Sequence, residues 1–125
     1  MEEHFGPHLL LDAFGCHETS LSSIERVFEF LNFLPDFIGM TKITQPHVFS
    51  YTGTNPLDYG VTGSVIIAES HISIHTFPAR DGFVTMDVYS CKDFDTKAVE
   101  IAFKQFFSPD SIQSQVILRG QGFKR

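Results

Sequence analysis

The residues best suited to chemistry lie in one short stretch, 68–78, with the sequence Ala-Glu-Ser-His-Ile-Ser-Ile-His-Thr-Phe-Pro. Successive side chains of a β-strand point to opposite faces, and the alternation here predicts a strand. One face is mostly aliphatic and suits a core: Ile72, Ile74 and Thr76. The other face carries His71, Ser73, His75 and Phe77. That second face is either a functional site or a solvent-facing surface with two incidental histidines.

Two familiar kinds of site fit these residues poorly. His71 and His75 are four residues apart, a zinc-ligand spacing on a helix, but on a strand they are separated by about 13 Å. No metal is therefore expected. Ser70, His75 and Cys91 could suggest a hydrolase, but the sequence contains no Gly-x-Ser-x-Gly motif and no identifiable acidic partner for the histidine.

Composition limits the class of protein further. A chain of 125 residues with 42% hydrophobic content can form one domain, 1–125, with a real core. No apolar run approaches the roughly 18 residues of a membrane span. The acidic start, Met-Glu-Glu-His-Phe, lacks the basic region of a secretory signal, so a cytoplasmic location is expected. The net charge of −6 argues against a nucleic-acid partner, and the two cysteines, Cys16 and Cys91, are expected to be free thiols.

The first half of the chain is predicted to hold one helix between strands. An apolar run predicts a strand over 6–14, and a polar turn follows at 19–23. Ser22 and Glu25 fit a capping box for a helix that starts near Ile24 and is ended by Pro35. Residues 41–51 are strand-like but broken at Pro46, and 52–59 is a loop rich in turn-forming residues.

The second half is predicted to hold most of the sheet. Strands are expected at 63–68, at 68–78 and, after the turn 79–82, at 83–90. A helix starting at Asp95 or Thr96 is ended by Pro109, a last strand covers 112–118, and 120–125 is expected to be a loose tail. The order β-α-β-β-β-α-β predicts an α+β two-layer sandwich, with two helices on one face of an antiparallel sheet.

The uncovered face of such a sheet would carry an aromatic patch. Phe77, Phe83 and Tyr89 fall on the same side as the two histidines. A large aromatic patch does not usually stay in water, so it either binds a ligand or packs against a second copy.

Residues 68–78, followed by Asp87-Val88-Tyr89-Ser90-Cys91, closely resemble the small prokaryotic S-adenosylmethionine decarboxylase proenzymes. Weaker similarity includes His8-Leu9-Leu10-Leu11-Asp12 and Gly60-Val61-Thr62-Gly63. The resemblance implies a pyruvoyl-dependent enzyme that decarboxylates S-adenosylmethionine for spermidine biosynthesis. It also implies the sandwich fold and a homodimer of cleaved units that pair their sheets.

The resemblance also implies a role for each matching residue. Ser70 would attack the Glu69 carbonyl, cutting the proenzyme into residues 1–69 (β chain) and 70–125 (α chain) and leaving a pyruvoyl group that forms a Schiff base with the substrate. His75 would be the acid/base of this processing, assisted by Thr62, and Cys91 would return a proton to the substrate carbon. Phe77, and less surely Phe49, match aromatic positions near the adenine, and core packing remains the alternative for both.

One departure from the family pattern bears on the substrate. Family members commonly have glutamate directly after the proline that matches Pro78, with a turn one residue shorter than 79–82. Because Ser70, His75 and Cys91 are all retained, an uncleaved binding module is not favoured. A paralogue acting on arginine or ornithine would keep the same three residues and would need a carboxylate for the substrate's cation, for which Asp81 is the candidate.

Overall fold

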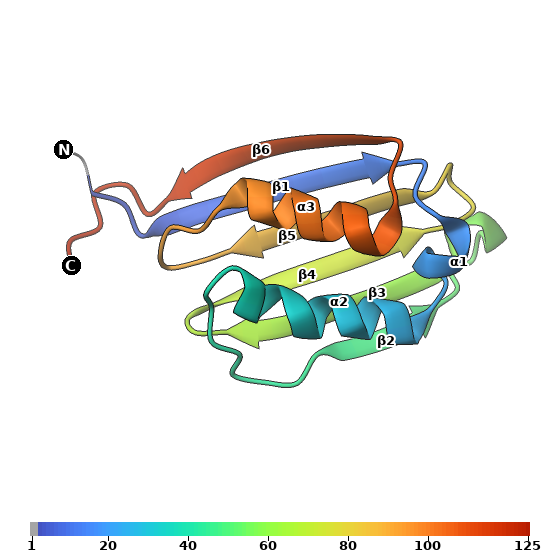
Figure 1. Cartoon of the computed structure of the whole chain (residues 1–125), viewed down its shortest axis with the longest axis horizontal. Coiled ribbons are helices and arrows are strands. Elements are labelled where there is room, and N and C mark those ends of the chain that lie inside the picture. The colour runs from blue at the N-terminus through green and yellow to red at the C-terminus, as the bar shows by residue number, and fades with distance from the viewer. Residues whose placement is uncertain (1–2) are drawn as a thin grey trace.

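The chain folds into a six-stranded antiparallel sheet with helices packed on one face (Figure 1). The computed structural model describes residues 3–125, so Met1 and Glu2 of the acidic start lie outside the described residues. The strands are β1 (Gly6–Phe14), β2 (His47–Tyr51), β3 (Gly60–Ile67), β4 (Ser70–Phe77), β5 (Phe83–Tyr89) and β6 (Ser111–Arg119). The helices are α1 (Glu18–Leu21), α2 (Ile24–Phe37), the 3-10 turn η1 (Pro56–Asp58) and α3 (Thr96–Phe107). The sheet order is β2-β3-β4-β5-β1-β6, and the predicted α+β sandwich is confirmed.

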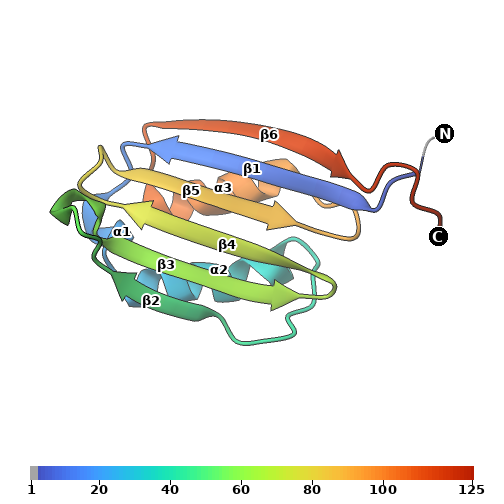
Figure 2. The same ribbon diagram turned by 180° about the vertical axis from the view of Figure 1, so that it is seen from behind.

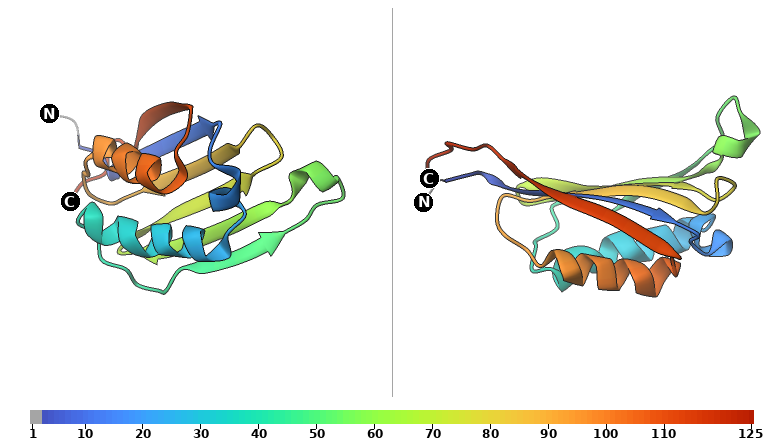
Figure 3. Two further views of the ribbon diagram at one scale, coloured as in Figure 1. Left: turned by 45° about the vertical axis from the view of Figure 1, so that its right-hand side comes forward. Right: turned by 90° about the horizontal axis from the view of Figure 1, so that it is seen from above.

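The core lies between the sheet and the two long helices, as the side view in Figure 3 shows. On β4, Ile72 and Ile74 are fully buried, as their alternation predicted. Thr76 can also be buried on this face because its hydroxyl both accepts and donates a hydrogen bond. It accepts from Val61 N–H at 2.9 Å and donates to the Leu21 carbonyl at 2.8 Å.

Helix α2 differs from its prediction at both ends. Ser23, not Ser22, is the N-cap, and its hydroxyl accepts from Arg26 N–H at 3.0 Å, so the predicted capping box is wrong by one residue. Pro35 does not end the helix, which continues to Phe37. Pro35 lacks the N–H that would bond the Leu31 carbonyl four residues back, but only two residues of the helix follow it and its ring is buried in the core. The expected turn at 19–23 contains part of the short helix α1.

Two strands also begin at residues other than those predicted. The broken strand expected over 41–51 begins only after Pro46, at His47, and before it only Lys42 bridges to Ile67. Strand β3 starts at Gly60, three residues earlier than predicted. A Cβ at Gly60 would lie 1.9 Å from the Thr76 carbonyl oxygen, so only glycine allows this close approach of β3 to β4.

The opposite face of the sheet carries no helix (Figure 2). Phe77, Phe83 and Tyr89 alternate with the buried residues of β4 and β5 and lie on this open face, as predicted. The loop containing η1 rises beyond the sheet on the side away from the helices (Figure 3, right). No helix among residues 3–125 is long and apolar enough to cross a membrane.

Candidate active site

Ser70 begins β4 directly after a tight hairpin. Ile67 of β3 pairs with Ser70, so Ala68 and Glu69 alone form the connection, and the Glu69–Ser70 peptide bond lies at its end. The Ser70 side chain is 8% exposed, and its Oγ has no hydrogen-bond partner among the described residues. Buried hydroxyls nearly always have a partner, which makes this one unusual. Ser70 therefore presents an uncommitted hydroxyl beside the Glu69 carbonyl.

Cys91 lies against the same hairpin. Tyr89 pairs with His71 across β4 and β5, so the chain just beyond Tyr89 runs beside the β3–β4 connection. The Cys91 Sγ is 3.8 Å from the Ala68 carbonyl oxygen. The thiol is partly exposed and lines a cavity of about 530 Å³. The cavity is also lined by the next two residues, Lys92 and Asp93, and by residues of both chain ends: Glu3, His4, Phe5, Gly6 and Arg125.

The C-terminal segment closes one side of this cavity, so the expectation of a loose tail is wrong. Gly122 N–H donates to the Glu3 carbonyl at 2.9 Å, and the Phe123 ring packs edge-on against Phe5 at 5.2 Å. The Arg125 guanidinium donates to the carbonyl of Cys91 at 3.0 Å and to that of Phe5. These partners are mostly backbone carbonyls, which no residue pattern reveals.

Thr62 and His75 form a second pair on the open face. They are cross-strand neighbours on β3 and β4, and Thr62 Oγ1 lies 3.2 Å from His75 Nδ1. Phe49 faces Thr62 from β2 and is 63% exposed, so core packing is wrong for Phe49. Phe77 also lies on this face and stacks on Phe83, with ring centroids 5.6 Å apart.

The two pairs do not meet within one chain. Ser70 and His75 are five residues apart on β4, a separation of about 16 Å. An odd number of residues also places their side chains on opposite faces, with Ser70 on the helix side beside Ile72. The structure thus places Cys91 beside the hairpin that carries Ser70 and joins Thr62 to His75, but separates the hairpin from the second pair.

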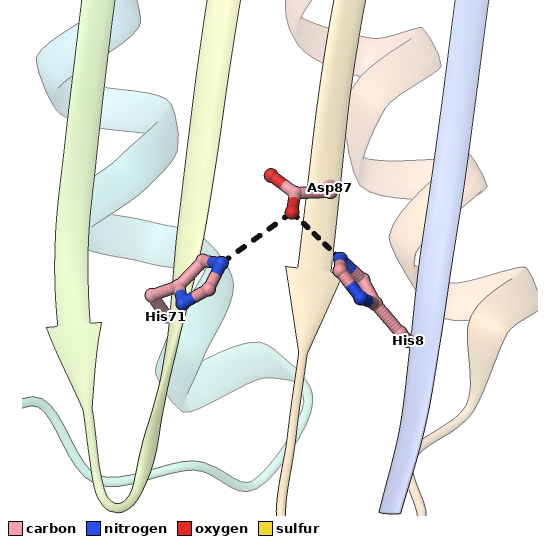
Figure 4. Close-up of side chains that lie close together, drawn as sticks. All are labelled: His8, His71 and Asp87. Atoms are coloured by element: carbon pink, nitrogen blue, oxygen red, sulfur yellow. Dashed lines mark hydrogen bonds and ion pairs between the residues drawn. The ribbon is translucent and has the colours of Figure 1, made fainter. Parts of the chain in front are cut away.

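A third polar cluster, which sequence analysis missed, joins His8, Asp87 and His71 across three strands (Figure 4). Asp87 Oδ2 lies 2.7 Å from His8 Nε2 and 3.4 Å from His71 Nε2, and Asp87 also accepts from the Ser73 hydroxyl. His8 and Asp87 both stood in the stretches of family resemblance. Only the β1–β5 register, however, brings them together across 79 positions of sequence.

Arg119 sets the hydrogen bonding of this cluster. Its Nη1 lies 3.2 Å from His8 Nδ1, and a guanidinium can only donate, so Nδ1 accepts and His8 Nε2–H donates to Asp87. Burial alone would raise the pKa of the Asp87 carboxyl, but hydrogen bonds from Ser73 and His8 and the pull of the two imidazoles outweigh it. The pKa of Asp87 is therefore lowered from its ordinary value of 3.8.

These hydrogen bonds bear on the metal site and the hydrolase site that were considered from the sequence. His8, His71 and Asp87 are close enough to hold a metal, but the His8 Nε2 lone pair that a metal needs is occupied by the proton donated to Asp87. His71 and His75, whose spacing raised the question of zinc, have different partners, Asp87 and Thr62. A serine hydrolase needs a histidine on its nucleophile, and Ser70 Oγ has no such partner among residues 3–125.

The chain is thus an α+β sandwich in which a serine with an unpartnered hydroxyl begins a strand after a hairpin and a cysteine lies beside that hairpin. A family model described as S-adenosylmethionine decarboxylase matches residues 7–120. The chain therefore belongs to the S-adenosylmethionine decarboxylase family.

Individual relatives cover nearly the whole chain. An S-adenosylmethionine decarboxylase proenzyme from Archaeoglobus fulgidus is 38% identical over 118 residues, which are 92% of this chain and 97% of that protein. One from Aquifex aeolicus is 34% identical over 96% of this chain and 84% of its own length. The crystal structure of the adenosylmethionine decarboxylase from Aquifex aeolicus superposes with a TM-score of 0.76 and 34% identity, covering 94% of this chain and 92% of that one.

The Asp87 cluster predicts a pH-dependent contribution to stability. Asp87→Asn should lower the free energy of unfolding by about 1–3 kcal/mol at pH 7, because hydrogen bonds to a charged acceptor are lost. Since the pKa of Asp87 is lowered in the folded chain, its stabilisation is present above the ordinary value of 3.8 and is lost as pH falls through the folded value. Urea unfolding should therefore show the difference from wild type closing on acidification below 3.8. Asp93→Asn, which changes a carboxylate that is 88% exposed, is the matched control. An Asp87→Asn deficit that stays constant with pH would contradict the assignment.

Proposed function

We propose that this chain is the proenzyme of a pyruvoyl-dependent S-adenosylmethionine decarboxylase, whose product feeds spermidine synthesis. One observation carries the proposal: a buried, unpartnered Ser70 hydroxyl at a hairpin, with the Cys91 thiol beside the same hairpin. Membership of the decarboxylase family supports it. A cytoplasmic location, predicted from the sequence, is consistent with the free thiols of Cys16 and Cys91.

Self-cleavage follows from the chemistry of Ser70. Its Oγ attacks the Glu69 carbonyl carbon, and breakage of the C–N bond converts the peptide into an ester with a free amine. Loss of the Ser70 α-proton then expels the Glu69 carboxylate, which ends the chain 1–69. The residue left at position 70 takes up water and releases ammonia, which leaves a pyruvoyl group at the start of 70–125.

The residues around Ser70 fit a group of this kind. The pyruvoyl carbonyl supplies an electron sink for decarboxylation that ordinary side chains lack. The Glu69–Ser70 bond ends a two-residue connection, and Cys91, which contacts this connection at Ala68, lines a cavity of about 530 Å³ that leaves room for a substrate. Cys91 Sγ lines this cavity, where it can donate a proton to the substrate carbon that has lost carbon dioxide.

The position of His75 favours a homodimer in which the active site is shared. His75 and Thr62 are the proposed processing pair, yet they lie about 16 Å along β4 from Ser70 of the same chain. The open face that carries them also bears Phe77, Phe83 and Tyr89, a surface suited to a second copy. We infer that two sheets pack face to face and that each His75 serves the Glu69–Ser70 peptide bond at the end of its partner's hairpin, rather than the core side on which the Ser70 hydroxyl lies.

Cleavage between Glu69 and Ser70 is tested by intact mass under denaturing conditions. Wild type should give two fragments, the larger ending at Glu69, and the fragment from position 70 should carry the mass of a pyruvoyl group. Ser70→Ala should remain one chain because it lacks the attacking hydroxyl. Ser50→Ala, which removes an exposed hydroxyl from β2, should be cleaved normally. A wild type that stays whole through long incubation would refute the proposal.

Decarboxylation is tested by release of labelled carbon dioxide from cleaved enzyme supplied separately with S-adenosylmethionine, arginine or ornithine. Only S-adenosylmethionine should be turned over. Cys91→Ala should still be cleaved, but its kcat should fall about 10²–10⁴-fold, the usual contribution of a general acid. Cys16→Ala is the control, because burial and nearby Asp110 raise the pKa of that thiol to about 12. Turnover of arginine or ornithine alone would replace the proposed substrate and make Asp81 the residue to test next.

The shared site is tested by co-expressing two differently tagged chains, Ser70→Ala and His75→Ala. Each alone should remain uncleaved. In mixed dimers the His75→Ala chain keeps its own Ser70 and receives His75 from its partner, so this chain alone should be cut. Light scattering on wild type should show at least two copies. Absence of cleavage in the mixture, or normal cleavage of His75→Ala alone, would overturn the shared arrangement.

A further inference from the structure

Cys91 occupies the middle of a turn, residues 90–92, that begins where β5 ends. Ser90 N–H donates to the Pro7 carbonyl at 3.1 Å, which ties the turn to β1. Lys92 N–H donates in its turn to the Ser90 hydroxyl at 3.1 Å. A serine hydroxyl that accepts from the N–H two residues further on closes a turn in the way a backbone carbonyl does. The backbone is therefore held directly before and directly after Cys91.

The Ser90 side chain is itself fixed by the core. It is fully buried, and its hydroxyl also donates to Met40 Sδ at 3.4 Å. On the backbone side, a Cβ at Gly6 would lie 1.8 Å from the Ser90 carbonyl oxygen, so the start of β1 packs directly against this residue. Moving Ser90 would therefore open the packing between β1, the end of β5 and the segment that follows α2.

Arg125 holds the other side of the same turn. Its guanidinium donates to the Cys91 carbonyl at 3.0 Å, and the same nitrogen donates to the carbonyls of His4, at 3.3 Å, and of Phe5. The guanidinium also lies over the Phe123 ring, 5.3 Å from its centroid. Hydrogen bonds from a charged donor are roughly twice as strong as neutral ones. The Cys91 carbonyl is thereby fixed to the segment that precedes β1.

These contacts decide where the Cys91 thiol can lie. Because its backbone is held on both sides, the side chain keeps only rotation about its Cα–Cβ bond, and Sγ lies 3.8 Å from the Ala68 carbonyl oxygen of the hairpin. A general acid acts only within hydrogen-bond reach of the atom that it protonates, and a misplacement of about 1 Å can cost roughly a hundredfold in rate. The position of this turn therefore matters to any proton that Cys91 donates.

We propose that Ser90 and Arg125 are positioning residues that hold the turn 90–92 against the β3–β4 hairpin, so that Cys91 delivers its proton to a single substrate carbon. Ser90 acts through the backbone of Lys92, and Arg125 acts through the carbonyl of Cys91 itself. This inference rests on the proposed function for its effect on catalysis, whereas the holding of the turn does not depend on that function.

Alkylation of Cys91 tests the holding of the turn in Ser70→Ala, which is expected to stay uncleaved and carry no pyruvoyl group. Cys16 is buried, so iodoacetamide should react at Cys91 alone, which peptide mass spectrometry verifies. Adding Ser90→Ala or Arg125→Ala should speed this reaction about fivefold, because the turn opens more often once a hydrogen bond is lost. Ser90→Thr and Arg125→Lys keep a hydrogen-bonding group and should react nearly as slowly as the parent. Unchanged rates in both alanine variants would overturn the proposal.

Turnover by cleaved enzyme tests the consequence for catalysis. In Ser90→Ala and Arg125→Ala, kcat for S-adenosylmethionine should fall about 10–100-fold with little change in KM, and self-cleavage should be complete. Once carbon dioxide has left, a proton that reaches the carbon of the pyruvoyl group instead leaves the substrate's nitrogen on the chain as alanine, and water releases the substrate as an aldehyde. N-terminal sequencing of 70–125, which a pyruvoyl group blocks and alanine does not, should therefore give more signal per turnover in both variants.

Ser114→Ala and Lys124→Ala are the matched controls and should change neither readout, because both side chains are exposed and lie outside the turn. A lower melting temperature with unchanged alkylation and unchanged alanine would show a structural role only and overturn the proposal. Because Arg125 is exposed, its variant keeps the test decisive even where loss of the buried Ser90 hydroxyl prevents folding.

The remaining outcomes separate the two residues and the two proposals. An effect in one variant alone would assign positioning to that residue and overturn it for the other. A higher KM with unchanged kcat in Arg125→Ala would indicate contact with the substrate and overturn positioning by Arg125. A wild type that releases no carbon dioxide would refute the proposed function and with it the catalytic effect, while the alkylation rates would still decide whether Ser90 and Arg125 hold the turn.

Discussion

The register of β4 between β3 and β5 is the constraint on which the rest of the structure depends. Side chains alternate with a period of two, so a slip of one residue would move every β4 side chain to the other face. Ile72 and Ile74 are fully buried against the helices, which makes such a slip costly. The same register holds Ser70 on the core side of the hairpin and His75 on the open face. The burial of two isoleucines thereby positions the reactive groups.

The residues proposed to react and the aromatic residues of the open face lie at opposite ends of the sheet. Ser70 and Cys91 lie where β4 begins and β5 ends, near the two chain termini, whereas Phe77 and Phe83 lie at the opposite end, beside the 79–82 turn (Figure 1). A rigid antiparallel sheet cannot fold back to bring these ends together. A two-fold related copy packed on the open face meets this need, because it sets the far end of one sheet against the near end of the other. This geometry connects the aromatic open face, the separation of His75 from Ser70 and the proposed dimer.

The Asp87 cluster places ionisable groups on the open face near the end of the sheet where β4 begins and β5 and β6 end. Arg119 of β6, His8 of β1, Asp87 of β5 and His71 of β4 form one continuous hydrogen-bonded row across the sheet. Each donor in the row has an acceptor, and these bonds define the tautomer of each histidine. The row therefore fixes side-chain orientations that isolated histidines would not keep. A hydrogen-bonded polar row beside the aromatic residues of the open face also favours a single alignment of a second sheet over that face.

The sequence by itself determined the strands around the hairpin, and its resemblance to the family pointed to the residues that are proposed to react. Period-two alternation predicted β4 and β5 and their buried faces, and the local pattern placed the start of α3 at Asp95 or Thr96, because these features depend on neighbouring residues. Only the tertiary structure decided which of these residues meet. Cys91 reaches the hairpin through the β4–β5 register, Arg125 closes the cavity by bonding backbone carbonyls, and Asp58 meets Arg80 through a loop contact. The end of α2 was also decided by the tertiary structure. Pro35 is buried in the core and the helix continues beyond it, although local rules predict that a proline ends a helix. Local pattern encodes the face on which a side chain lies, whereas contacts between distant segments follow from packing that no short stretch of sequence contains.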